Sequence, residues 1–138
     1  MVPAQGVIEL ARSYKDTPFH HQGRQPGVGL DCVGLLACAF QAAGVPIRDR
    51  TNYPRQPIPA DMLDALREHT ERVPKRASWL PADVLWMHFD EPQHLALYTG
   101  RSVIHAYAQV GRVVEHRMDA TWMGRVVSVW RHPGVSHE

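Results

Sequence analysis

The sequence Gly27-Val28-Gly29-Leu30-Asp31-Cys32-Val33-Gly34-Leu35-Leu36 decides the fold that we expect for this chain. Its glycines predict a loop, and the residues that follow Cys32 are apolar or small with a single exception. Gly44 and Pro46 then supply stop signals for a helix. We therefore predict a mostly buried helix from about Asp31 to Ala43, with Cys32 in its first turn.

A thiol in the first turn of a helix is chemically favoured as a thiolate. Unpaired backbone N–H groups and the helix dipole stabilise the anion, and such cysteines have pKa values lowered to roughly 3.5–7.5. The alternative is a buried structural cysteine. Cys38 is no disulfide partner for Cys32, because six helical residues separate the two by about 9 Å along the axis and a disulfide needs Cα atoms within roughly 7 Å. Cys38 is expected in the core.

Length and charge narrow the class of protein. The 138 residues, 44% of them hydrophobic, predict one globular domain over 1–138. A formal charge of +1 argues against nucleic acid as a partner. No uncharged run is long enough to insert into a membrane. The N-terminus lacks the pattern of a secretory signal, so the protein is either cytosolic or carried outside by another route.

Residues 1–44 are expected to be helical and residues 45–78 irregular. A first helix is predicted from Pro3 to about Lys15 by its apolar stripe of helical period. Three prolines within residues 54–59 dictate extended backbone. A short amphipathic helix is predicted from Asp61 to about Arg72.

From residue 79 to residue 132 the apolar pattern changes to period two, which predicts strands. A short helical turn is expected over 119–123, and the tail over 133–138 is expected to fray. Helices followed by an antiparallel sheet of about five strands make an α+β fold. The predicted strands cover residues 84–89, 93–98, 102–107, 112–117 and 125–131, with a turn at Asp90-Glu91-Pro92 between the first two.

Three side chains in the loops could line a site. His20 and His21 are adjacent, and adjacent residues rarely bind one ion, so a surface or cleft-lining role is expected instead of a metal site. Tyr53 could reach into a cleft, or it could pack on the body of the domain as an ordinary loop aromatic.

A hairpin around Thr99-Gly100 brings two histidines together. If these two residues form the turn, Tyr98 pairs with Arg101 and the register places His94 opposite His105. Cβ atoms of directly opposed residues lie about 4.5–5.5 Å apart, so the two imidazoles could form a hydrogen bond.

Cys32, His94 and His105 together have the composition of a thiol-dependent catalytic site. Nucleophilic catalysis needs a thiol, a base and a group that fixes the tautomer of the base. Cys32 would be the nucleophile, His94 the base and His105 the orienting group, with the Cys32 N–H stabilising the oxyanion. Asp31 and Tyr53 are the further candidates for contacts with the oxyanion or the substrate. His88 and His116 are weaker candidates, and a zinc site built on the same Cys and His residues is an alternative.

Four motifs, in this order, resemble those of the NlpC family of papain-like cysteine peptidases. The resemblance implies a circularly permuted papain-like fold with a Cys32, His94 and His105 site that needs no cofactor and no metal. It also implies cleavage of peptidoglycan stem peptides, typically between D-glutamate and the diamino acid. The motifs are Leu30-Asp31-Cys32-Val33-Gly34-Leu35, Leu80-Pro81-Ala82-Asp83-Val84-Leu85, His94-Leu95-Ala96-Leu97-Tyr98-Thr99-Gly100 and Ile104-His105-Ala106.

Residues 17–24 and Tyr53-Pro54-Arg55 are similar to a short branch of this family found in phage and prophage tails. This similarity implies a virion tail component, made in the host cytoplasm and acting in the periplasm or cell wall, where it would open the wall as DNA enters. Its partners would be tail-tip or baseplate proteins. The alternative is a structural tail-tip or assembly protein whose Cys-His-His site is vestigial.

Two positions depart from the family pattern. Val33 stands where many members have serine directly after the cysteine, and that serine helps to bind stem peptides with a free amino terminus. Ala82 replaces the usual glycine before Asp83. The first change bears on the exact substrate, and the second is expected to affect only a turn.

Overall fold

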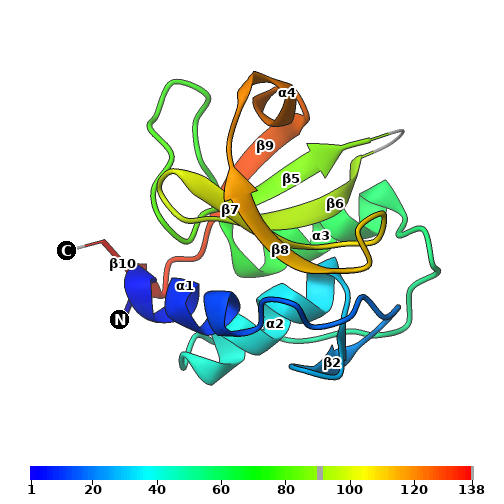
Figure 1. The fold of residues 1–138 in the computed structure, drawn as a ribbon. Coiled ribbons are helices and arrows are strands. Elements are labelled where there is room, and N and C mark those ends of the chain that lie inside the picture. Colours follow the sequence, from blue (N-terminus) through cyan, green and yellow to red (C-terminus); the bar gives the residue numbers. More distant parts are fainter. Residues whose placement is uncertain (90–91, 138) are drawn as a thin grey trace.

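The structure is a computed structural model that describes residues 1–89 and 92–137. Its helices are α1 (Ala4–Ser13), α2 (Cys32–Ala42), α3 (Pro59–His69) and the short α4 (Ala120–Met123) (Figure 1). None of the helices in these residues is both long and apolar enough to cross a bilayer. The predicted turn at Asp90 and Glu91 lies outside the described residues.

The strands form one large sheet and two small pairs. The sheet has six strands in the order β4-β9-β5-β6-β7-β8, and every neighbouring pair is antiparallel. The predicted α+β class with an antiparallel sheet is therefore confirmed. The strands are β1 (Val2–Pro3), β2 (Arg24–Gln25), β3 (Gly29–Leu30), β4 (Glu71–Arg72), β5 (Val84–His88), β6 (Pro92–Tyr98), β7 (Ser102–Tyr107), β8 (Arg112–Arg117), β9 (Val126–Arg131) and β10 (Val135–Ser136).

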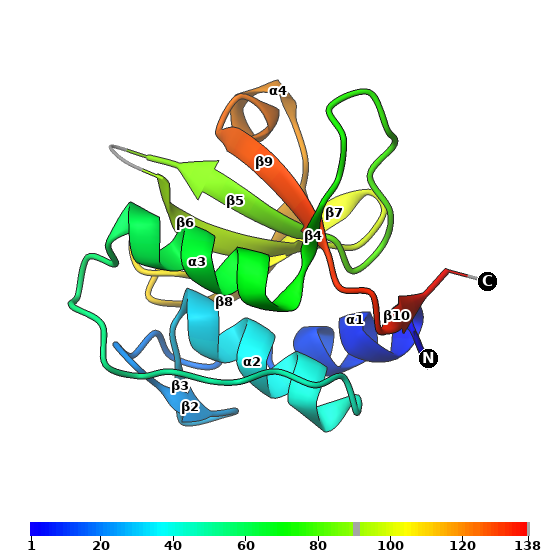
Figure 2. The same cartoon turned by 180° about the vertical axis from the view of Figure 1, so that it is seen from behind.

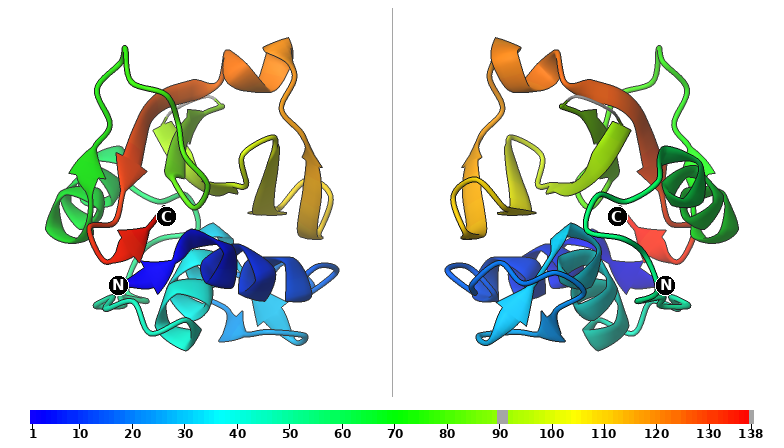
Figure 3. Two further views of the ribbon diagram at one scale, coloured as in Figure 1. Left: turned by 90° about the vertical axis from the view of Figure 1, so that its left-hand side faces the viewer. Right: turned by 90° about the vertical axis from the view of Figure 1, so that its right-hand side faces the viewer.

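The helices and the sheet form two layers. α1 and α2 pack together beneath the curved sheet, and α3 lies behind it (Figures 1 and 3). Figure 2 shows α3 in front of β6, with the segment after α2 running across α2 to reach it. The main core lies between the layers, and its members include Ile8, Ala11, Leu35, Leu36, Phe40, Leu95, Leu97 and Ile104.

α2 begins where the sequence predicts because Asp31 caps it. The Asp31 carboxylate accepts a hydrogen bond from the Gly34 N–H at 2.8 Å, which satisfies one of the unpaired donors of the first turn. A side chain at Gly34 would have no space, since a Cβ there would lie 2.0 Å from the carbonyl oxygen of Gly23. This glycine therefore serves close packing between the loop and the helix.

The third helix was predicted to end too late. α3 ends at His69, Thr70 is already extended, and Glu71 and Arg72 form the edge strand β4, which pairs with β9. The charges of this segment suit a helix face and an edge strand equally well, so only the pairing partner, distant in sequence, selects the strand.

The prediction that the tail frays was wrong for residues 133–137. Val135 and Ser136 form β10, which pairs in parallel with Val2 and Pro3 of β1. Val135 is buried in the main core, and the Val2 N–H donates to the Gly134 carbonyl at 2.9 Å. The two ends of the chain therefore hold each other, as their neighbouring positions in Figure 3 show.

The β6–β7 hairpin has a different register from the predicted one. Tyr98 pairs with Val103, and the N–H of Thr99 donates to the Ser102 carbonyl at 3.0 Å, so Gly100 and Arg101 form the turn. Gly100 has φ +111°, which a residue with a side chain rarely adopts. The register therefore differs by two residues, a shift that leaves every side chain on the same face.

Candidate active site

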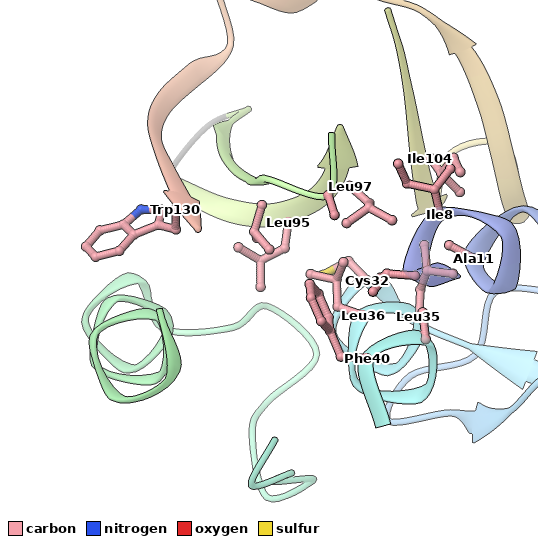
Figure 4. Close-up of a cluster of buried hydrophobic side chains, with 14 of the residues drawn as sticks. Ile8, Ala11, Cys32, Leu35, Leu36, Phe40, Leu95, Leu97, Ile104 and Trp130 are labelled. Atoms are coloured by element: carbon pink, nitrogen blue, oxygen red, sulfur yellow. The ribbon is translucent and has the colours of Figure 1, made fainter. Parts of the chain in front are cut away.

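Cys32 is the first residue of α2, and its sulfur faces the sheet. The close-up of the core shows the sulfur at the N-terminal end of α2, beside Leu95 of β6 (Figure 4). The backbone groups of Leu95 and Val33 lie close enough to this sulfur to oppose the rise in its pKa. The residue is only 7% exposed. The thiol is therefore held against the strand that carries His94.

The thiol is neutral at rest. Burial raises the pKa of Cys32 to about 12, with a further increase from the neighbouring Asp31 carboxylate. The prediction of a lowered pKa was wrong, because the loss of solvation outweighs the stabilisation of a thiolate by backbone N–H groups at the start of α2.

His94 and His105 form the predicted hydrogen bond. Nε2 of His94 lies 2.7 Å from Nδ1 of His105. In the observed register the two residues are diagonal neighbours instead of direct opposites, because continuing the ladder places Tyr107 opposite His94. A diagonal is still within reach of imidazole rings on the same face. A register irregularity between Met87 and His88 lies beside His94, where such a bulge bends the strand and re-aims side chains.

Burial keeps both rings uncharged. It lowers the pKa of His94 to about 4 and that of His105 to about 2, the latter also through the neighbouring histidines. His105 is fully buried, and the aromatic rings of Phe89, Tyr107 and Trp122 surround the pair. His94 is therefore neutral at pH 7, with one of its two ring nitrogens unprotonated.

Cys32 and His94, the predicted nucleophile and base, share no hydrogen bond in the part of the chain that the structure describes. The sulfur lies instead beside Leu95, the residue that follows His94 in β6 (Figure 4). Catalytic hydrogen bonds are often long in unliganded enzymes and tighten on substrate binding. The pairing of Cys32 with His94 stays a prediction.

His116, a weaker candidate in the sequence analysis, extends the pair to a row of three rings. Its Nε2 lies 2.9 Å from Nε2 of His105. In the β7–β8 ladder His116 pairs with Val103, so it is again a diagonal neighbour of His105. The periodicity of β8 alone could have placed His116 on the same face as His105, but not in contact with it.

Asp31 holds the loop before α2 in place. One carboxylate oxygen accepts from Gly34 N–H and from Nη1 of Arg24, and the other accepts from Gln22 N–H and from the Tyr53 hydroxyl. Asp31 is only 4% exposed. These contacts give Asp31 a structural role, and a role in substrate binding stays a prediction.

Tyr53 joins the extended segment after α2 to this network. Its hydroxyl accepts from Nη2 of Arg24 at 3.0 Å and donates to Asp31. Burial, followed by the hydrogen bond to Asp31, raises the pKa of Tyr53. Arg24 also binds Asp49 and the carbonyl of Arg50. Arg24 was missed from the sequence, because nothing local marks a loop arginine as the centre of a network.

The two loop histidines contact protein groups. The ring of His21 packs edge-on against Tyr53 at 5.6 Å, and Nδ1 of His20 is hydrogen-bonded to the carbonyl of His21. In the row formed by His94, His105 and His116, ring nitrogens face one another instead of a shared ion position. Within residues 1–89 and 92–137, no group of three or more His, Cys, Asp and Glu residues has the geometry of a metal site.

The sequence profile of the NlpC/P60 family matches residues 16–131. The chain belongs to the NlpC/P60 family. No curated protein sequence matches the chain. The match spans most of the chain, from the end of α1 to the last strand of the sheet, and includes every predicted site residue.

Solved NlpC/P60 structures share the fold. The peptidoglycan hydrolase RipB from Mycobacterium tuberculosis superposes with a TM-score of 0.67 at 23% identity, over 93% of this chain and 63% of RipB. An NlpC/P60 family protein from Bacillus cereus superposes with a TM-score of 0.71 at 18% identity, over 96% of this chain and 41% of that protein. This chain thus spans less than two thirds of the length of some relatives. The predicted NlpC-type papain-like fold is confirmed.

The NlpC/P60 fold also serves proteins without catalysis. RipD from Mycobacterium tuberculosis, described as a non-catalytic NlpC/p60 domain protein adapted to peptidoglycan binding, superposes with a TM-score of 0.60. Its identity to this chain is 20%, over 93% of this chain and 95% of RipD. The fold by itself therefore does not distinguish a hydrolase from a binding protein.

Ala82, one of the two departures from the NlpC family pattern, lies in a turn that needs a left-handed backbone conformation. Ala82 has φ +71° in the turn before β5, and its N–H donates to the Tyr98 carbonyl at 2.8 Å. The glycine that is usual here would adopt this conformation without strain. Asp83 is fully buried and accepts from Arg131 and from the Leu80 N–H. The turn therefore anchors β5 to β9.

A cavity of about 340 Å³ lies next to the start of α2, where Cys32, the predicted nucleophile, is found. It lies between α2, α3 and the segment over 47–58, and a volume of this size suits a small ligand. Val33 and Leu95, which follow Cys32 and His94 in the chain, line it. Tyr53 is also part of the lining, as the cleft-lining interpretation expects.

Proposed function

We propose that this NlpC/P60 domain is a cysteine peptidase that hydrolyses amide bonds in peptidoglycan stem peptides. The observation that carries the proposal is the hydrogen-bonded pair His94 and His105 in the strand against which the Cys32 thiol is held. A thiol, an imidazole base and an orienting group are the set that thiol peptidases need. The description of RipB as a peptidoglycan hydrolase supports the choice of substrate.

The reaction begins from the neutral thiol. Nδ1 of His94 takes the Cys32 proton, since Nε2 is already bonded to His105. The sulfur attacks the amide carbonyl carbon, and a C–S bond forms. His94 returns the proton to the amine nitrogen as the C–N bond breaks. Water, deprotonated by His94, then cleaves the thioester, releasing a carboxylic acid and restoring the thiol.

The oxyanion of each tetrahedral intermediate needs hydrogen-bond donors. As the first residue of α2, Cys32 has no partner for its N–H within the helix, so this group is available to the oxyanion. The stem peptide would reach the sulfur along the cavity between α2 and α3. Tyr53, on the wall of this cavity, is our candidate for a substrate contact there.

The preferred bond is the one between D-glutamate and the diamino acid, as in the resembling peptidases. Val33 lines the cavity directly after the nucleophile and has no hydroxyl to bind a free amino terminus. We therefore expect stem peptides still attached to the glycan to be cleaved at least as well as free peptides.

Mass spectrometry of muropeptides tests the activity. The purified domain, Cys32→Ala and the matched control Cys38→Ala are each incubated with peptidoglycan of defined stem peptide. Products from the wild type and Cys38→Ala, with none from Cys32→Ala, are expected. Equal product from Cys32→Ala would overturn the proposal, as would no product from the wild type on peptidoglycan of any stem-peptide type.

A second candidate is a peptidoglycan-binding or structural protein without catalysis. The near-complete burial of Cys32 and its raised pKa favour it, and RipD is a precedent for such a function on this fold. Co-sedimentation with insoluble peptidoglycan discriminates the two. Binding by the wild type and Cys32→Ala alike, with no soluble product from either, is expected of the second candidate only.

We further propose a virion tail as the place of action, with tail-tip or baseplate proteins as partners. The similarity of residues 17–24 and 53–55 to tail-borne members supports this proposal. Mass spectrometry of purified virions, or of tail particles induced from a lysogen that encodes the chain, tests it. Peptides of this chain in the particle are expected, and their absence from complete particles would contradict it.

A further inference from the structure

We propose that His116 is a positioning residue: acting through His105, it holds His94 in the one tautomer that leaves Nδ1 free to take the thiol proton. The three rings are joined in a row by hydrogen bonds of 2.7 and 2.9 Å. The inference rests on the proposed function only in giving His94 the part of the base. Which nitrogen of each ring carries the hydrogen follows from the group that His116 contacts at the outer end of the row.

The outer end of the row is a backbone carbonyl. Nδ1 of His116 lies 3.0 Å from the carbonyl oxygen of Arg117. A carbonyl oxygen only accepts hydrogen bonds, so Nδ1 of His116 carries the hydrogen. In its neutral form an imidazole has one N–H, and in this form Nε2 of His116 presents a lone pair to His105.

The tautomer of each ring then determines the tautomer of the next ring in the row. His105 must donate from Nε2 to the lone pair of His116, which leaves Nδ1 of His105 as an acceptor. Nδ1 of His105 is bonded to Nε2 of His94, so His94 donates from Nε2. The remaining nitrogen of His94, Nδ1, is left with its lone pair, as a general base requires.

The reverse order of protons is unfavourable. It would direct a lone pair of His116 at the lone pairs of the Arg117 carbonyl, and would put the hydrogen of His94 on Nδ1. A doubly protonated His105 would also force the wrong tautomer on His94, by donating to it. Burial of His105, and the histidine on each side of it, oppose this charge.

The surroundings keep the row in place. Trp122 of α4 packs on the rings of both His105 and His116, at 5.2 and 4.5 Å between centroids. Tyr107 stacks on His105 at 5.1 Å. The guanidinium of Arg125 lies over the Trp122 ring, 5.5 Å from its centroid. Without His116, nothing in these contacts would choose between the two tautomers of His105, because a water molecule can donate or accept.

Long-range ¹H–¹⁵N spectra of the imidazole groups test the inference directly. In the wild type, His94 and His105 are expected to carry hydrogen on Nε2 and His116 on Nδ1. Signals are assigned with single His→Gln variants. A wild-type His94 protonated on Nδ1 would overturn the inference whatever the variants do.

Two substitutions of His116 separate tautomer control from packing. His116→Phe keeps a ring against Trp122 but cannot accept from His105, whereas His116→Gln can accept through its side-chain carbonyl. In His116→Phe, His94 is expected to show a mixture of tautomers and hydrolysis to fall roughly 10–100-fold, a part of the roughly 10²–10⁴ that a general base contributes. His116→Gln is expected to restore the single tautomer and most of the rate.

His88→Phe, at an exposed position at the end of β5, is the matched control and should change neither readout. An unchanged His94 tautomer in folded His116→Phe would overturn the inference. If His116→Phe does not fold, the wild-type spectrum and His116→Gln still decide. A wild type without hydrolytic activity would remove the proposed function, yet the tautomers would still be measured.

Discussion

The His94 and His105 rings share a hydrogen bond of 2.7 Å across a diagonal of the β6–β7 hairpin, and both rings are buried without charge. Because these histidines are buried as neutral rings, the free energy of unfolding depends on pH. Protonation of His105 breaks the row, because its Nδ1, which accepts from Nε2 of His94, would then become a donor, and protonation of His94 on Nδ1 places a charge in a buried site.

The stability of the domain should therefore fall on mild acidification. The unfolded chain binds a proton at each histidine near pH 6.5, but folded His94 does so only near pH 4 and His105 near pH 2. Between pH 6.5 and 4 the unfolded state holds more protons, so the free energy of unfolding falls by about 1.4 kcal/mol per pH unit for each ring. Urea unfolding at pH 7, 6 and 5 measures this slope.

The control for this slope is the double variant His94→Gln with His105→Gln. Its free energy of unfolding should change less than that of the wild type between pH 7 and pH 5. The carboxylate of Glu115, whose pKa is lowered to about 2 by Arg12, loses its contribution only below about pH 4.5 and does not interfere. Equal free energies of unfolding at pH 7 and pH 5 would contradict the burial of neutral rings.

Alkylation of Cys32 should depend steeply on pH. Because burial raises the pKa of this thiol to about 12, the thiolate fraction rises about tenfold per pH unit across the accessible range. In a Cys38→Ala background, the rate of modification by iodoacetamide should rise in this way from pH 7 to pH 10, as followed by intact mass. A rate that levels off below pH 8 would indicate a resting thiolate.

His105→Ala should lower turnover without abolishing it. His105 orients the base and takes no proton, whereas His94→Ala removes the base itself, which contributes roughly 10²–10⁴ in rate. We expect the loss from His105→Ala to lie within that range and below the loss from His94→Ala, measured as muropeptide release per minute. Equal losses would mean that the two rings act as one unit.

Gly34→Ala should destabilise the domain and displace the loop before α2. The new Cβ would lie 2.0 Å from the Gly23 carbonyl oxygen and 2.9 Å from Nη1 of Arg24. We expect the free energy of unfolding to fall by about 1–3 kcal/mol or more, the usual cost of overpacking. Gly6→Ala in α1 is the matched control: nothing lies within 4 Å of its Cβ, so a gain of about 0.5–1 kcal/mol is expected.

Ala82→Gly should stabilise the domain. Ala82 has φ +71°, and a left-handed conformation costs a residue with a side chain roughly 1–2 kcal/mol. The added freedom of glycine in the unfolded chain offsets part of the gain, so we expect a net increase of about 0.5–1 kcal/mol in urea unfolding. Ala108→Gly, at an exposed turn residue outside the left-handed region, should lose stability instead.

The sequence by itself determined what depends on neighbours along the chain. A capping aspartate, an apolar run and a stop signal place α2 to within one residue, because these are interactions of adjacent turns. The alternation of apolar side chains places β7 and β8 at their observed bounds. The contact between His94 and His105 was predictable for the same reason: an even shift in register leaves both rings on one face.

Only the tertiary structure decided what depends on segments far apart. The parallel pairing of β10 with β1 and the edge strand β4 need partners that no local pattern identifies. The register of the hairpin depends on which two residues form the turn: the prediction placed it at Thr99 and Gly100, whereas Gly100, with positive φ, is the first of the two turn residues.

The chemistry of the site depends on burial, which is a property of the whole fold. The start of a helix favours a thiolate at Cys32, but the sheet that covers the sulfur removes its solvation and raises the pKa. The same sheet brings His116 of β8 to His105 of β7. Desolvation and contacts across strands are set by packing, so local sequence could name Cys32, His94 and His105 but not their protonation states.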